Sequence, residues 1–266
     1  MFHKSLQLLF NHNIGEGYYR AGFSCAEMAK ESRPGQFVML RISDQTWEGK
    51  LSRPFSISNV KDDIIEIVFE TVGANTRNLA EAEKGRTLSV IGPLGNGFKI
   101  DCSAQAHLLV AGGIGIAPIP YLAIRILQEY PHSKVAVLFG VRGETKLFLT
   151  DFFKEYKIDL KISSDDGSIG EKGFVTTLLS KELDAIKDRK VAIYACGPKP
   201  MLKATSELAL ERNVHCQVSL EEVMACGVGA CLGCATKTHA NSGTVYKMVC
   251  KDGPVFDAKD VIFDEN

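Results

Sequence analysis

The feature that most restricts how this chain can fold is a set of four cysteines towards its C-terminal end. Cys226, Cys231 and Cys234 lie within the stretch MACGVGACLGC, and Cys250 follows after fifteen intervening residues. This C-x4-C-x2-C-x15-C spacing is the plant-type pattern that holds a [2Fe–2S] cluster. The filler residues Gly227, Gly229, Ala230 and Gly233 let backbone N–H groups approach anionic sulfurs. We therefore predict that the four cysteines are cluster ligands.

Two other interpretations of the cysteines stay open. Structural zinc modules usually present their ligands as two short pairs, whereas three of these thiols share one loop. Buried structural cysteines are the second alternative, and four at this spacing by chance is the weaker explanation. A Rieske-type site needs two histidines, but His239 is the single one between Cys234 and Cys250, so we interpret it as a loop residue.

Length and composition define the class of protein. The 266 residues suffice for two domains and a small module, and 45% hydrophobic with 24% charged residues is typical of a globular protein. A formal net charge of −1 argues against bulk nucleic-acid binding. Because the N-terminal apolar run is too short for a signal peptide and no membrane-spanning run occurs, we expect a cytoplasmic protein with reduced thiols.

The first hundred residues have the pattern of short β-strands. Strands are expected at Phe37–Ile42, Phe55–Val60, Ile64–Glu70 and Leu88–Ile91, with a short helix at Thr76–Glu83. Several short strands at this spacing predict a small antiparallel barrel.

Further along the chain, strands alternate with helices, which predicts a parallel sheet with crossover connections. Strands are expected at 107–111, 134–140, 159–167, 190–198 and 215–221, and helices at 119–130, near 147–156, near 174–184 and at 200–212. The resulting domain prediction is a barrel over 1–101, an α/β domain over 102–215 and a cluster module over 216–266.

Three short motifs carry further chemistry. AGGIGIAP, with Gly112, Gly113 and Gly115, follows a strand and opens a helix near Pro118, where backbone amides can face a pyrophosphate. A plain tight turn is the alternative, because Pro118 stands where the G-x-G-x-x-G pattern has its last glycine. In the second motif, ACGP, Cys196 could lie against a flat ligand ring or be a small buried core residue. In the third, RPFS, Arg53 could neutralise a phosphate or be an ordinary surface arginine.

The order RPFS, GPLGNGF, AGGIGIAP, ACGP resembles the ferredoxin reductase superfamily, in which a barrel carries a flavin and an α/β domain carries a nicotinamide nucleotide. The C-terminal EEVMACGVGACLGC and CKDGPVF make the chain similar to the electron-transfer subunits of two-subunit, NAD-linked dihydroorotate dehydrogenases. This resemblance covers essentially the whole chain.

The resemblance implies a role for each matching residue. It implies FAD contacts from Arg53, Pro54, Phe55, Ser56, Glu70, Thr71, Val72, Gly73, Asn75 and Thr76. It implies nicotinamide-nucleotide contacts from Gly112, Gly113, Gly115, Gly197 and Pro198, with Cys196 as the catalytic candidate. Asn75 replaces a family glycine, and asparagine tolerates left-handed backbone angles better than most residues.

The resemblance also implies a path for electrons. They would pass from the FMN of a separate catalytic subunit, in a heterotetramer of two copies of each subunit, through the cluster and FAD to NAD+, within pyrimidine (UMP) biosynthesis. Asp165 and Asp166 favour NAD over NADP because they would repel a 2′-phosphate, while Arg142 is the counter-argument. A flavin and iron–sulfur subunit of an NAD(P)H:ferredoxin or sulfide-type oxidoreductase, and a zinc-stabilised binding protein without redox function, are the alternatives.

Overall fold

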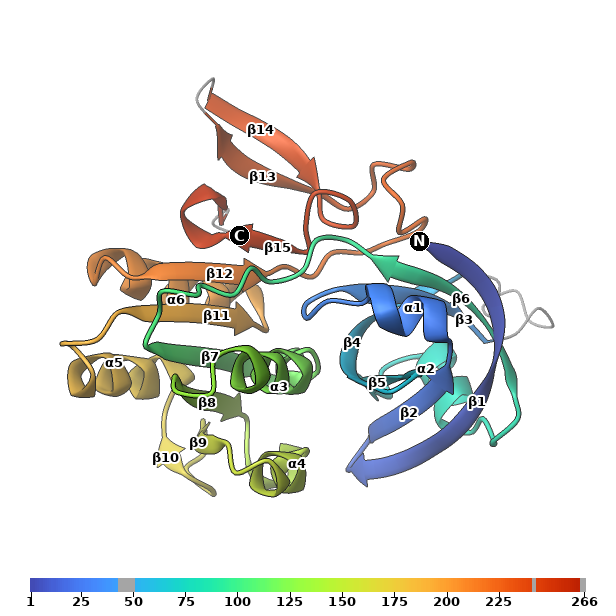
Figure 1. The fold of residues 1–266 in the computed structure, drawn as a ribbon, viewed down its shortest axis with the longest axis horizontal. Helices are drawn as coiled ribbons and strands as arrows, with labels where there is room; N and C mark the ends of the chain where they lie inside the picture. Colours follow the sequence, from blue (N-terminus) through green and yellow to red (C-terminus); the bar gives the residue numbers. More distant parts are fainter. Residues whose placement is uncertain (43–50, 241–242, 264–266) are drawn as a thin grey trace.

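The computed structural model describes residues 1–42, 51–240 and 243–263, and within them it contains the predicted antiparallel barrel. Six strands close in the order β1-β2-β5-β4-β3-β6, at the right of Figure 1. They are β1 (Phe2–Gly15), β2 (Tyr18–Ser24), β3 (Phe37–Arg41), β4 (Arg53–Lys61), β5 (Ile64–Glu70) and β6 (Thr87–Leu94), with helices α1 (Ala26–Glu31) and α2 (Ala74–Ala80). Alternate residues of these strands fill the barrel interior.

The second half is a seven-stranded sheet in the order β10-β9-β8-β7-β11-β12-β15, at the left of Figure 1. Its strands are β7 (Ala106–Gly112), β8 (Lys134–Val141), β9 (Asp159–Ser164), β10 (Glu171–Lys172), β11 (Val191–Cys196), β12 (His215–Ser219) and β15 (Val255–Asp257). All neighbours are parallel except β12 and β15. The apolar runs at β7 and β11 are buried throughout, as expected for strands covered on both faces.

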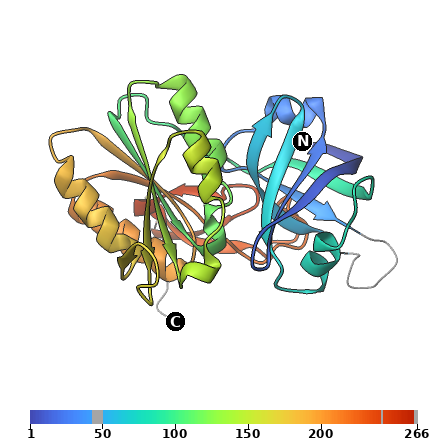
Figure 2. The same cartoon turned by 90° about the horizontal axis from the view of Figure 1, so that it is seen from below.

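Helices cover both faces of this sheet (Figure 2). Side chains of α3 (Ile119–Glu129) and α4 (Thr150–Glu155) pack into one core, and those of α5 (Val175–Ala185) and α6 (Lys199–Glu211) pack into the other. Short 3-10 helices η2 (Gly113–Ile116), η3 (Glu144–Lys146) and η4 (Ala258–Asp260) complete the connections. No helix within the described ranges is long and apolar enough to cross a membrane.

The C-terminal segment joins the two halves. After β12 the chain runs across the junction of barrel and sheet, forms the hairpin β13 (Ala235–Ala240) and β14 (Gly243–Met248), and returns as β15 (Figure 1). His239 lies in β13 and is exposed, so our interpretation of it as a loop residue was wrong. The predicted domain boundary between 215 and 216 stays a prediction, and it falls at the first residue of β12.

Candidate functional site

The four cysteines lie on two loops that contact each other. Backbone N–H groups point at their sulfurs: Gly229 N–H donates to Cys250 Sγ over 3.1 Å, and Cys231 N–H donates to Cys226 Sγ over 3.4 Å. Cys250 N–H lies 3.5 Å from Cys234 Sγ. The loop takes this course through left-handed φ angles of 70° at Gly227 and 81° at Gly229, which glycine adopts without strain.

The cysteines fall into two pairs, in which the N–H of Cys231 faces the sulfur of Cys226 and the N–H of Cys250 faces the sulfur of Cys234. Within the described ranges, no group of three or more His, Cys, Asp or Glu side chains is arranged around a single metal position. Two thiolates per iron is the arrangement of a two-iron cluster with four cysteine ligands. The donor set and its pairing therefore fit the [2Fe–2S] group that the spacing predicts.

Two of the thiols have opposite acid–base properties. The N–H group of Val228 is the first of several donors that lower the pKa of Cys226 to about 6. Burial, followed by the neighbouring thiol of Cys234, raises the pKa of Cys250 to about 12. Cys226 is thus ready to bind as a thiolate, whereas the Cys250 thiolate needs a cation beside it.

Both cysteine loops rest on the barrel. A Cβ on Gly227 would lie 2.8 Å from Met39 Sδ, so the backbone there is in contact with β3. The loop after Cys250 is held by Asn96, whose N–H donates to Gly253 O over 2.6 Å and whose Nδ2 donates to the carbonyls of Lys251 and Asp252. The cysteine ligands are therefore fixed against the barrel at two points.

The residues expected to bind FAD lie at one edge of the barrel. Because β4 and β5 are antiparallel, the start of β4 and the end of β5 lie at the same end of the barrel, where the rings of Phe55 and Phe69 meet edge to face at 5.8 Å. Arg53 is half-buried and donates to the carbonyl of Ser52. This edge contacts the α/β domain, through β4 with α3 and through β5 with η2.

The turn after β5 is built around Thr76. Its hydroxyl accepts hydrogen bonds from the N–H groups of Val72 and Gly73, which closes the turn and starts α2. Asn75 lies in the first turn of α2, and its φ is not positive. The left-handed conformation that we considered for Asn75 is therefore not used, and a helical residue without glycine's freedom suffices there.

The two glycine motifs of the α/β domain lie side by side. Ala111 and Cys196 are paired neighbours at the ends of β7 and β11. A Cβ on Gly115 would lie 2.5 Å from Gly197 Cα, so only glycine allows η2 to pass this close to the second motif. A Cβ on Gly113 would meet nothing within 4 Å, which leaves that backbone open beside the helix start.

Cys196 is fully buried at the end of β11. Burial and the nearby Glu221 carboxylate raise the pKa of its thiol. A neutral buried thiol is not a nucleophile, so a role for Cys196 in hydride transfer is limited to contact with a ring.

The loops after β8 and β9 pack against each other, and the Asp166 side chain takes part in this packing through Ser168. Asp166 Oδ1 accepts hydrogen bonds from the backbone N–H and hydroxyl of Ser168, and that hydroxyl accepts from the N–H of Glu144. Asp165 donates its N–H to Val141 O. Nearby, Phe174 at the start of α5 has 73% of its surface exposed, a large value for a phenylalanine.

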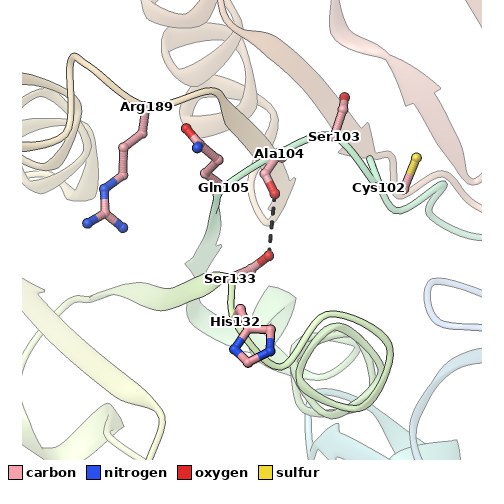
Figure 3. Close-up of a pocket in the computed structure, with 7 residues that line it drawn as sticks. All are labelled: Cys102, Ser103, Ala104, Gln105, His132, Ser133 and Arg189. Atoms are coloured by element: carbon pink, nitrogen blue, oxygen red, sulfur yellow. Dashed lines mark hydrogen bonds between the residues drawn. The ribbon is translucent and has the colours of Figure 1, made fainter.

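A hollow of about 540 Å³ lies away from the cysteine loops and the glycine motifs (Figure 3). It is lined by Cys102, Ser103, Ala104, Gln105, His132, Ser133 and Arg189. These residues precede β7, β8 and β11, so the hollow is at the amino-terminal edge of the sheet. The glycine motifs follow β7 and β11 and lie at the opposite edge, where ligands of α/β sheets bind.

Sequence reasoning did not single out Met39, Asn96 or Phe174. Asn96 lies inside the quoted GPLGNGF, but its contacts with Lys251–Gly253 join segments far apart in the chain. An aromatic residue directly after Gly173, at a strand-to-helix turn, was the available signal for Phe174.

Two family models match the chain. One is described as the iron–sulfur cluster binding domain of dihydroorotate dehydrogenase B and matches residues 221–262. The other is described as an oxidoreductase NAD-binding domain and matches residues 109–207. Each falls on the segment for which the sequence predicted that chemistry.

Curated relatives match nearly end to end. A protein of Caldanaerobacter subterraneus subsp. tengcongensis, named dihydroorotate dehydrogenase B (NAD(+)), electron transfer subunit, is 39% identical over 97% of both chains. Proteins of the same name from a Geobacillus species and from Clostridium perfringens are 37% and 36% identical, covering 94% and 95% of both chains.

Solved structures share the fold. A chain of an NADH-dependent reduced ferredoxin-NADP oxidoreductase superposes with a TM-score of 0.83 and 30% identity, over 97% of this chain and 90% of that one. The ferredoxin NADP+ reductase of Neisseria gonorrhoeae, solved with FAD and NADP, superposes with a TM-score of 0.66 at 16% identity, over 79% and 91%. At that identity the likeness shows the fold alone.

Proposed function

The chain belongs to the family of electron-transfer subunits of NAD-linked dihydroorotate dehydrogenases, and on this premise we propose that it carries electrons from a catalytic partner subunit to NAD+. The observation that carries the proposal is the placement of the cysteine loops. They rest on the outer face of the barrel, beside the strand that contains RPFS.

The cluster ligands are Cys226, Cys231, Cys234 and Cys250. Paired cysteines and aimed N–H groups support this assignment, because such donors stabilise sulfur that carries negative charge. Cys231 is exposed while Cys234 and Cys250 are buried, so one side of the cluster would face solvent or a partner.

The FAD site is assigned to the barrel edge formed by β4, the end of β5 and the start of α2. Its proposed contacts are Arg53, Pro54, Phe55, Ser56, Glu70, Thr71, Val72, Gly73, Asn75 and Thr76. The half-buried guanidinium of Arg53 can neutralise a phosphate, and the strand next to it can hydrogen-bond a flat heteroaromatic ring.

The NAD site is assigned to the carboxyl edge of the sheet. Gly112, Gly113 and Gly115 would face the pyrophosphate, with Cys196, Gly197 and Pro198 beside the nicotinamide. Phe174 offers an exposed ring on which an adenine can stack, at the same edge of the sheet. The Asp166 carboxylate already accepts hydrogen bonds from Ser168, so Asp165 is the carboxylate that remains to disfavour a 2′-phosphate.

The order of groups follows from their chemistry. An iron–sulfur cluster passes electrons singly, NAD+ takes a hydride, and bound flavin supplies the change between the two. The contacts of the barrel strands support this order: β4 and β5 contact α3 and η2 on the side of the glycine motifs, and β3, which pairs with β4, contacts the loop of Cys226.

The surface around the cluster suits a protein partner. Val223, Val228, Leu232 and Tyr246 are large hydrophobic side chains of the C-terminal segment that are exposed, and Val228 and Leu232 lie in the same loop as Cys231. Exposed apolar side chains that gather in a patch are typical of interaction sites. We assign this surface to the FMN-containing catalytic subunit, in a heterotetramer of two copies of each, which native mass spectrometry of the complex would test. A cytoplasmic location and a place in pyrimidine biosynthesis stay predictions.

The proposal is tested by the visible spectrum of the anaerobically purified chain before and after NADH or NADPH. Flavin and iron–sulfur bands that bleach preferentially with NADH are expected. Preferential bleaching by NADPH would favour the ferredoxin-linked alternative, which the structural likeness at a TM-score of 0.83 also supports. Protein that contains zinc and no visible absorbance, when made with iron and flavin supplied, would contradict both.

A further inference from the structure

Strand β3 has two faces with different surroundings. Successive side chains of a strand point to opposite sides. Val38 and Leu40 pack into the barrel interior, whereas Phe37 and Met39 belong to the core that includes Cys234 and Cys250. Met39 therefore leaves the barrel and points towards the cysteine loops.

The Met39 side chain is in direct contact with the first of those loops. It is fully buried, and Gly227, next to the ligand Cys226, lies over its sulfur. With a φ of 70° and no Cβ, Gly227 brings its backbone closer to Met39 than any other residue type could. Leu94 of β6 completes the surface under Gly227, because its Cδ1 atom is 3.5 Å from the place where a Cβ on Gly227 would lie.

On its other side Met39 adjoins the strand that contains RPFS. Met39 and Pro54 are directly paired across β3 and β4. Side chains paired in this way lie about 4.5–5.5 Å apart between their Cβ atoms. One side chain therefore fills the space between the backbone of the cysteine loop and the proposed flavin strand.

We propose that Met39 is a positioning residue that sets the separation between the cluster and the flavin and keeps water out of the gap. This inference rests on the proposed function. Within that function, the electron transfer between cluster and flavin would depend on Met39. A methionine suits this place because its flexible, polarizable side chain fills irregular gaps without introducing a polar group.

The affected step is a single electron transfer. With both groups bound, a hydride from NADH would bring two electrons to the flavin; one would pass to a ferric ion of the oxidised cluster, and the other would stay on the flavin. The rate of such a transfer falls steeply with distance. The added negative charge on the cluster is better stabilised by water than by an apolar side chain, so wetting the gap raises the cluster potential.

Three variants test the proposal in the full chain loaded with both groups. Met39→Ala shortens the side chain, and Met39→Leu nearly conserves its volume. Leu88→Ala makes a comparable cavity inside the barrel, since Leu88 of β6 is fully buried among interior residues. The readouts are iron content, the rates of flavin and cluster bleaching after rapid mixing with NADH, and an EPR-monitored redox titration of the cluster.

For Met39→Ala we expect flavin bleaching to be retained, cluster bleaching to slow by about tenfold, as is usual for losses in the surroundings of a metal site, and the cluster potential to rise. Met39→Leu should stay close to the wild type and Leu88→Ala should lose only stability. Iron loss in Met39→Ala but not in Leu88→Ala would also support the proposal.

Unchanged cluster kinetics and potential in a fully loaded Met39→Ala protein, or equal changes in Leu88→Ala, would overturn it. In those cases the proposed function stands, because wild-type protein still contains both groups. A wild type without flavin or iron would instead contradict the proposed function.

Discussion

Single residues at this site divide into those that hold charge and those that make room. The cysteines supply thiolates, and the N–H groups of their own loop stabilise them. Glycines at 115 and 227 make room because they lack a Cβ. They allow two pieces of backbone to come within contact distance.

The thiol assignment predicts different outcomes for two exposed cysteines. Cys231→Ser should lower iron content by about tenfold or more, because a serine hydroxyl does not replace a thiolate, while NADH still reduces the flavin. Cys102→Ser, in the hollow at the other edge of the sheet, should leave iron content unchanged. Iron and flavin analysis with rapid-mixing kinetics measures both, and full iron content in Cys231→Ser would refute the ligand assignment.

The glycine assignment predicts that Gly115→Ala separates the two nucleotide-binding motifs. Its Cβ would meet the backbone of Cys196 and Gly197, which cannot move aside like a flexible side chain. Overpacking of this kind costs about 1–3 kcal/mol. We expect a lower melting temperature and a higher KM for NADH with an artificial acceptor, at unchanged FAD content. An unchanged KM would show that the motifs bind NADH independently of this contact.

At the scale of helices and strands, periodicity predicted most of the α/β half correctly. The expected helix 119–130 is α3, and the expected strand 107–111 lies within β7. The sequence prediction named neither β1 nor the β13–β14 hairpin. β1 carries polar residues such as His3, Lys4 and Asn11 among its apolar ones, and the hairpin exposes much of both strands, so neither has a clear apolar pattern.

One buried carboxylate ties three elements together. Glu182 of α5 accepts hydrogen bonds from Lys134 of β8, over 3.2 Å, and from Lys161 of β9. Burial alone would raise the pKa of Glu182, but the two lysines hold it below its ordinary value. The stability that this group contributes is therefore present above the unfolded-state pKa and is lost as the pH falls through the folded-state value.

Glu182→Gln should lower the free energy of unfolding at pH 7 by about 1–2 kcal/mol, less than for a fully buried pair because water screens the half-exposed lysines. The difference from the wild type should shrink once the pH falls below the ordinary glutamate pKa of about 4.3 and on through the lowered folded-state value. Urea unfolding at a series of pH values measures it. A difference that does not change with pH would mean that packing rather than charge explains the loss.

At the scale of the whole molecule, the C-terminal segment completes both halves. β15 extends the sheet, Gly227 rests on β3, and Asn96 holds the loop after Cys250. The motifs that predicted the chemistry of each part are local in the sequence. The contacts that place the parts against one another join residues far apart in the chain, so neither periodicity nor spacing could predict them.

Asn96→Ala should loosen this attachment. Losing two side-chain hydrogen bonds of about 1 kcal/mol each should cost about 1–2 kcal/mol and increase hydrogen exchange in residues 250–256, while β7 and β8 keep their protection. The backbone bond from Asn96 to Gly253 is retained in this variant. Unchanged exchange in 250–256 would show that this backbone bond and the packing of Pro254 suffice.

The most direct test of electron transfer through this chain is the reduction of NAD+ by dihydroorotate, followed at 340 nm, with the purified chain and an FMN-containing catalytic subunit from the same organism. NADH should form only when both subunits are present, and Cys231→Ser should abolish its formation while NADH still reduces the flavin of the variant. Equal NADH formation without this chain, or undiminished formation with Cys231→Ser, would contradict a path through the cluster.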